Sequence, residues 1–170
     1  MHAIRTNRAK RRRTVGEPEP VDLIHLVSAD GDRCIVRVTG RHQPGILTGH
    51  DTLRADVLVS TSFLDARLEL YLFQEDLSSW KHELEGLVPG SEAGIGGGRG
   101  LELGIRLNED QSMCVTIHDP DRLSTFFWIQ PQADWIQDHR GRLDRLRQVW
   151  PREVIETAPM VYEWSPDRMN

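Results

Sequence analysis

The sequence predicts an α+β fold: a mainly antiparallel β-sheet of about seven strands, or a β-sandwich, with two amphipathic helices packed on it. Most apolar residues alternate with polar ones, as in strands that have one wet face. Two segments instead have apolar residues at steps of three and four, as amphipathic helices require. All connections are short enough for antiparallel neighbours, and no internal repeat is visible in the 170 residues.

The first half of this pattern predicts two hairpins followed by a helix. Asp30-Gly31 is a dipeptide typical of a hairpin turn, and Asp65-Ala66 predicts a second tight turn. Pro89-Gly90 ends the segment with helical periodicity. The expected strands are residues 22–28, 33–39, 53–63 and 68–72, and the expected helix is residues 77–87.

The second half predicts a third hairpin, one further strand and a second helix that ends before Pro151. The glycine-rich stretch 94–100 is interpreted as a flexible linker, because phosphate-binding loops follow a strand and open a helix, whereas this stretch does the reverse. The further strand is apolar on both faces, so we expect it to be central or covered by a helix. The expected strands are residues 101–107, 113–117 and 123–130, and the expected helix is residues 135–150.

Charge divides the chain into an arm and a body. Residues 1–16 carry six basic side chains and no acid, so the rest of the chain carries −11 against −5 for the whole. We expect residues 1–20 to be a disordered basic arm with a Pro-rich spacer, and residues 21–151 to be a single β-rich domain. Residues 152–170 are expected to be an extension that adds an edge strand or docks loosely.

The arm has the composition of a phosphate-binding segment, because each neutralised phosphate releases counterions whatever the base sequence. Nucleic-acid association through the arm is therefore one hypothesis for function, although the acidic body opposes it. An anionic membrane surface, a solvated tail without a partner, and a native start near Val15 are the alternatives. The basic side chains concerned are Arg8, Lys10, Arg11, Arg12 and Arg13.

The loop from Gly40 to Asp51 brings together Arg41, His42, His50 and Asp51. Loops on a rigid sheet commonly carry binding residues, so the loop predicts a small anion site with Arg41 as the charge clamp and a histidine as acid or base. The alternative is a turn-rich connector whose histidines are solvated or bonded to backbone. We expect no metal, because the spacing of the two histidines matches no metal-binding motif.

Other chemically capable side chains are interpreted as structural. His139 lies on the apolar stripe of the second helix and His25 lies within the first strand, and at such places a histidine is usually a hydrogen-bonded core residue. Cys34 and Cys114 are 80 residues apart, so we expect free thiols in a reducing compartment, the first facing inward and the second outward. Trp128 is expected in the core, with the lining of a ligand pocket as the alternative.

Five phrases of the sequence resemble an uncharacterised actinobacterial (streptomycete) family, the domain of unknown function numbered 5959. The resemblance covers about residues 21 to 165, omits the basic arm, and implies an actinobacterial, cytoplasmic protein without implying a reaction. The phrases are Asp22-Leu-Ile-His-Leu26, Val36-Arg-Val-Thr-Gly-Arg41, Pro44-Gly-Ile-Leu-Thr-Gly-His-Asp51, Trp135-Ile-Gln-Asp-His-Arg140 and Val149-Trp-Pro151.

These observations favour a non-catalytic binding or regulatory module of an actinobacterial cytoplasm, which offers the Arg41 to Asp51 loop to a protein or small-molecule partner. The alternative is a small enzyme or accessory protein of specialised metabolism, with His50 and Asp51 as an acid–base pair. No cofactor is expected, and no apolar run approaches the ~20 residues that span a bilayer. The 19 Arg against 2 Lys are typical of a GC-rich genome.

Overall fold

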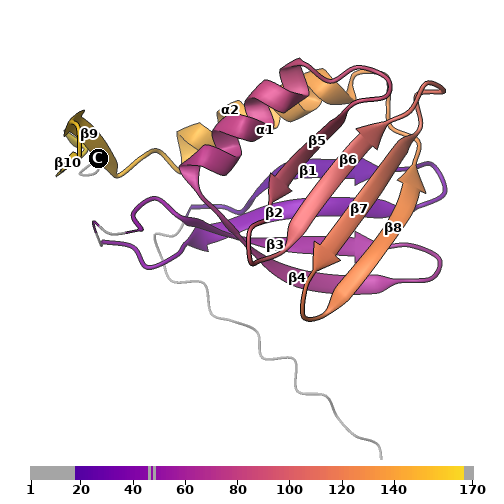
Figure 1. Ribbon diagram of the computed structural model, residues 1–170, viewed down its shortest axis with the longest axis horizontal. Coiled ribbons are helices and arrows are strands. Elements are labelled where there is room, and N and C mark those ends of the chain that lie inside the picture. Colours follow the sequence, from indigo (N-terminus) through magenta and orange to yellow (C-terminus); the bar gives the residue numbers. More distant parts are fainter. Residues whose placement is uncertain (1–17, 46, 48, 167–170) are drawn as a thin grey trace, which may run out of the picture.

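Two four-stranded antiparallel sheets and a pair of helices form the body of the protein (Figure 1). The computed structural model describes residues 18–45, 47 and 49–166. The α+β prediction is confirmed. Each sheet is a meander, so strands that follow one another in the chain are also neighbours in the sheet. Neither described helix is long and apolar enough to cross a membrane.

The chain builds the same unit twice, four strands and then a helix. The first unit consists of β1 (Val21–Val27), β2 (Arg33–Arg41), β3 (Leu53–Ser60), β4 (Asp65–Leu72) and α1 (Gln74–Glu85). The second consists of β5 (Glu92–Gly96), β6 (Glu102–Leu107), β7 (Met113–Asp119), β8 (Leu123–Ile129) and α2 (Trp135–Val149). This repetition is structural, since the sequence shows no matching repeat.

The hydrophobic core lies between the two sheets and under the helices. The strands contribute every second side chain to this core. In β3 alternate residues are buried from Leu53 to Val59, and in β7 alternate residues are buried from Met113 to Ile117. Trp80 of α1 and Leu146 of α2 are fully buried in the same cluster. One core therefore joins both units.

Each helix covers the first strand of the other unit, and the two helices lie side by side (Figure 1). On α2, the His139 Nε2 atom accepts a hydrogen bond from the backbone N–H of His25 in β1 at 3.0 Å. On α1, the Glu83 carboxylate accepts one from the backbone N–H of Gly94 in β5 at 2.7 Å. The helices thus satisfy backbone donors at two sheet edges, which would otherwise be left open.

Three details of the sequence-based prediction are wrong. The glycine-rich stretch is not only a linker, because its first part is paired with β6 as strand β5. The strand expected at 53–63 ends at Ser60, and the turn falls on Thr61–Leu64, where the Thr61 backbone N–H donates to the Leu64 carbonyl oxygen. The described residues contain ten strands against the roughly seven expected, and the additional ones are β5 and the two strands of the tail.

The third error concerns the strand at 123–130, which was expected to be central or covered. β8 instead ends the second sheet, and Phe126 and Trp128 are exposed on its outer face. Phe127 and Ile129 are buried in the core, and Leu123 packs against it. An apolar run on both faces does not itself say whether a second layer covers the strand.

The tail forms a hairpin of its own, β9 (Val154–Ala158) and β10 (Val161–Trp164). These strands pair with each other and join neither four-stranded sheet. Figure 1 shows the hairpin beyond one end of the helices, apart from the sandwich. The tail therefore adds a separate two-stranded ribbon rather than an edge strand of the main sheets.

Candidate functional site

The loop between β2 and β3 is held by the carboxylate of Asp51. Its Oδ1 atom accepts hydrogen bonds from Arg41 Nη1 at 2.9 Å and from the Glu153 backbone N–H at 2.7 Å. Its Oδ2 atom accepts one from the Val154 backbone N–H at 3.1 Å. The Asp51 side chain is 0% exposed, so these bonds replace the water that it loses on burial. Asp51 thereby ties the loop to the start of the tail.

Arg41 belongs to the same hydrogen-bond network, and its side chain is 11% exposed. Its guanidinium group also donates to the backbone oxygen of Pro151, lies 3.5 Å from the Glu153 carboxylate and stands 5.8 Å from the centre of the Trp150 ring. The predicted site residues Arg41 and Asp51 are therefore brought together, but they face each other and the tail. Their hydrogen-bonding groups are used within the chain.

Asp51 adopts a positive φ of 58°, a conformation that Asp tolerates better than most residues. The loop is closed at the same point, where His42 N–H donates to the Thr52 carbonyl oxygen at 2.8 Å and the Thr52 hydroxyl donates to the Gly49 oxygen. The backbone oxygen of Asp51 in turn accepts a hydrogen bond from the Gln74 side chain of α1. These bonds give the two loop histidines defined positions.

His50 points away from His42, toward the tail hairpin. Its Nδ1 atom lies 3.4 Å from Asp51 Oδ2, and its ring is 5.3 Å from that of Tyr162 in β10. It lines a cavity of about 430 Å³ between the tail and α1, together with Gln74, Ser78 and Ser79. The predicted acid–base pair is therefore in loose hydrogen-bond contact beside a cavity.

His42 lies on the other side of the loop and lines a cavity of about 860 Å³, larger than the one beside His50. We call this cavity the end groove. Its ring stands edge-on to Tyr71 at the end of β4, with 4.7 Å between ring centres. Phe73, just before α1, is exposed beside them. Tyr71 and Phe73 were missed, because nothing in the sequence places the end of β4 beside this loop.

Two turns of the second sheet complete the end groove. One is the glycine turn between β5 and β6, in which Gly96, Gly97 and Gly98 all have positive φ. The other is the turn between β7 and β8, where the Asp119 carboxylate accepts the Asp121 backbone N–H, a bond by which Asp commonly stabilises a turn. The glycine cluster was the one sequence signal for this wall, and it was interpreted as a linker.

The end groove combines apolar surface with charges of both signs. Its apolar side chains are Leu70, Tyr71, Phe73 and Leu101. Its charged side chains are Glu69, Asp76, Arg99, Asp119, Asp121 and Arg122. Burial and the neighbouring Glu69 raise the pKa of Tyr71 above its ordinary value, so its phenol remains protonated to a higher pH than that of a free tyrosine.

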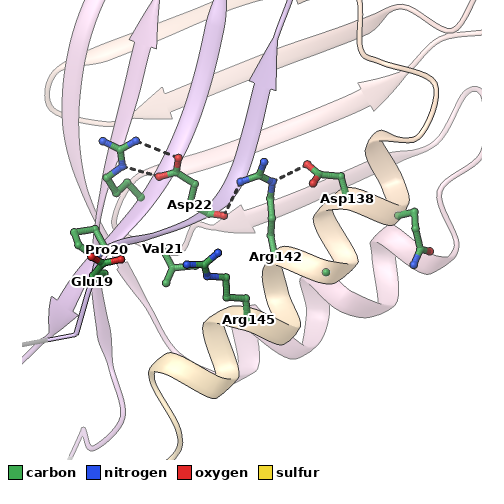
Figure 2. A pocket seen from close by; sticks show the side chains of 10 residues that line it. Glu19, Pro20, Val21, Asp22, Asp138, Arg142 and Arg145 are labelled. Carbon is green, nitrogen blue, oxygen red and sulfur yellow. Dashed lines mark hydrogen bonds and ion pairs between the residues drawn. The ribbon is translucent and has the colours of Figure 1, made fainter.

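Figure 2 shows a third cavity, of about 660 Å³, between β1 and α2. Arg37 forms two hydrogen bonds to the Asp22 carboxylate, while Arg142 donates to Asp138 and to the Asp22 backbone oxygen. Burial raises the pKa of the Asp22 carboxyl, but the hydrogen bonds from Arg37 and His25 lower it by more, so the pKa lies below its ordinary value. These charges are largely neutralised by each other.

The remaining candidates lie elsewhere. His139 is fully buried, with Nδ1 2.7 Å from the Trp135 oxygen, so it is the hydrogen-bonded core histidine that was expected. Cys34 is buried and Cys114 half-buried, both as free thiols. Trp128 was expected in the core, but it is 56% exposed on the outer face of the second sheet and does not line the end groove. Among residues 18–45, 47 and 49–166, no three His, Cys, Asp or Glu side chains form a metal-binding group.

The basic arm, Arg8 to Arg13, lies outside the described residues, so nucleic-acid association through it stays a prediction.

Fold and site together define a two-sheet α+β domain with a groove at one end, formed by turns from both sheets. The chain belongs to a family described as a family of unknown function (DUF5959), and the match covers residues 21–151. No curated protein and no solved structure matches the chain. The matched range ends at Pro151, just before the tail residues whose backbone binds Asp51.

Proposed function

We propose that the protein is a non-catalytic binding module whose ligand occupies the end groove. The observation that carries this proposal is the groove itself, about 860 Å³ in volume, which is the size of small-molecule sites. Apolar and aromatic walls with a few polar groups are the usual composition of such sites. His42 is the residue of the predicted loop that contacts the ligand, whereas Arg41 and Asp51 hold the loop in place.

The charges of the end groove favour a ligand with an apolar ring and an amine. Four carboxylates and two guanidinium groups line it, so its own charge is negative. The ring edges of His42 and Tyr71 and the exposed face of Phe73 suit an aromatic or cyclic body. The carboxylates then accept hydrogen bonds from the amine.

The test is chemical-shift mapping of the isotope-labelled protein with a library of small aromatic amines. We expect shifts in the backbone amides of residues 42–43, 69–73, 96–101 and 119–122, and weaker binding to His42→Ala and Phe73→Ala. Phe63→Ala is the matched control, because Phe63 is also an exposed phenylalanine but lies in the β3–β4 turn. Shifts confined to other surfaces, or unchanged binding to both groove variants, would contradict the proposal.

An enzyme is the second candidate, favoured by the His50–Asp51 contact beside the 430 Å³ cavity with its two serines. In this reading Asp51 orients the imidazole and His50 carries the proton. A fluorophosphonate probe tests it: labelling of Ser78 or Ser79 that is lost in His50→Ala supports an enzyme. An unlabelled protein rules out a serine nucleophile in this cavity.

The proposed setting is the cytoplasm of an actinobacterium. Two observations support it: 19 Arg against 2 Lys, and two cysteines that are free thiols. Peptide mass spectrometry of the protein isolated from its own host, with separate cell-envelope and soluble fractions, checks the location.

A further inference from the structure

The two sheets have four outer edges, and three of them are protected. α2 covers β1, where His139 accepts the N–H of His25, and α1 covers β5, where Glu83 accepts the N–H of Gly94. β4 is protected by charge instead, because alternate exposed positions along it are charged. Charges on an edge strand oppose pairing with another strand. The charged positions are Asp65, Arg67 and Glu69.

β8 has none of these protections. Residues 123–133 contain no charged side chain, and the first proline, Pro131, comes only after the strand. β8 pairs with β7 without a bulge from Leu123 to Ile129. In Figure 1, neither helix of the described chain lies along its free edge. A regular and uncharged edge of this kind is a template for a further strand.

The outer face of β8 adds apolar surface to this edge. Phe126 is 62% exposed and Trp128 is 56% exposed. Their partners on β7 are Thr116 and Cys114, which are also uncharged. Exposed aromatic rings next to an open strand edge are a common composition of protein interfaces.

We propose that β8 pairs antiparallel with β8 of a second copy of this chain, across a two-fold axis. The pairing joins two four-stranded sheets into one of eight strands and brings Phe126 and Trp128 of both copies together. It goes beyond the ligand-binding function and does not depend on it.

The distribution of charge favours a second copy of the chain as the partner of the β8 edge. The chain beyond residue 16 carries −11, so two copies repel each other across most of their surfaces. At β8 they meet without any charge. A two-fold axis also requires a self-complementary strand, and an uncharged strand meets no like charge when it faces itself.

The area predicts a dimer that depends on concentration. Aromatic side chains bury about 150–250 Å² each, so four half-exposed rings contribute roughly 400–500 Å². With two strand edges the total is at most about 1,000 Å², because the outer face of the rings stays open to water, and this lies below the roughly 1,200–2,000 Å² of stable specific interfaces. We therefore expect dissociation in the micromolar range rather than the nanomolar range.

Sedimentation velocity of the full chain, at protein concentrations from about 2 to 200 μM, tests the proposal. We expect the mass to rise from 19.5 kDa toward twice that value. Phe126→Lys should remain at the lower mass, whereas Phe63→Lys, a control at another exposed phenylalanine, should behave as the parent does. Circular dichroism confirms that both variants are folded.

Amide hydrogen exchange assigns the surface. Pairing through β8 predicts that amides of residues 123–129 exchange more slowly as protein concentration rises, while those of β4 do not change. A parent chain that stays monomeric at about 200 μM overturns the proposal, as does equal dissociation of both lysine variants. Protection of β8 that appears only with another protein present assigns the edge to a different partner and also overturns it.

Discussion

Replacing Asp51 by Asn tests whether the buried carboxylate holds the tail to the body. In the native protein this carboxylate accepts two backbone N–H bonds from residues 153 and 154 and one bond from Arg41. Asn keeps one acceptor oxygen but turns the other into a donor that faces an N–H group. Arg41, 11% exposed, then loses its main anionic partner.

The expected loss is about 3 kcal/mol of unfolding free energy. Removing one partner of a buried ion pair costs about 3–5 kcal/mol, because the other charge stays buried. Asn keeps part of the hydrogen bonding, so we expect the lower end of that range. With a urea dependence of about 2 kcal/mol per molar, the unfolding midpoint falls by roughly 1.5 M.

The matched control is Asp56→Asn. Asp56 accepts a 2.6 Å hydrogen bond from Arg67, but Arg67 is largely exposed, and such surface pairs contribute about 0–1 kcal/mol. Urea unfolding followed by tryptophan fluorescence measures both variants, and hydrogen exchange follows the amides of Glu153 and Val154. The reasoning is refuted if Asp51→Asn loses no more stability than the control, or if those two amides exchange at the parent rate.

Three further predictions concern His139, Gly96 and Cys34. Burial lowers the pKa of His139 below its ordinary value, so as the pH falls the imidazole binds a proton in the unfolded chain before it does in the folded one. The contribution of His139 to stability is therefore complete above about pH 6.5 and declines as the pH falls. Thermal unfolding should show a smaller decline between neutral and acidic pH in His139→Gln than in the parent. Gly96→Ala should lower the unfolding free energy, measured in urea, by about 2–3 kcal/mol, because φ is +83° and a Cβ would meet the Leu101 backbone oxygen. Gly98→Ala should lower it by only about 1 kcal/mol, because φ is +68° but a Cβ would lie in open space. Equal losses in the two variants would contradict this reasoning. Burial raises the pKa of the Cys34 thiol to about 12, so a thiol reagent should modify only Cys114 in the native protein and both cysteines in urea. Fast labelling of Cys34 in the native protein would contradict the buried position of this side chain.

Periodicity predicted the elements well where one face of a strand or helix is wet. In β3 the alternation of Leu53, Ala55, Val57 and Val59 matches the buried face residue by residue. The stripe of α1, with Leu77, Trp80 and Leu84 buried, was predicted in the same way. These patterns are local, because each depends on the repeat of a single element.

Periodicity failed where glycine or a doubly apolar run replaced the alternation. β5 contains two glycines, which supply no side chain to alternate, yet Ala93 and Ile95 are buried and the strand pairs fully with β6. β8 has aromatic residues on both faces, and its place at the edge follows from sheet order. Sheet order is a long-range property that no single strand encodes.

Of the candidate site, the sequence indicated only the loop from Gly40 to Asp51, and the four polar residues of that loop separate in space. Arg41 and Asp51 face the tail, His50 faces a cavity beside α1, and His42 faces the end groove. The partners of Asp51 are more than 100 residues away, so no local signal could have shown that its carboxylate is used internally.

By itself the sequence determined the α+β class, the alternating faces, both helices and the acidic body behind a basic arm, because composition and periodicity are properties of neighbouring residues. Only the tertiary structure decided that turns from two different sheets meet in one groove, that Asp51 binds the tail, and that β8 is left open. Each of these depends on segments distant in sequence. The packing of the two sheets on one core brings them together.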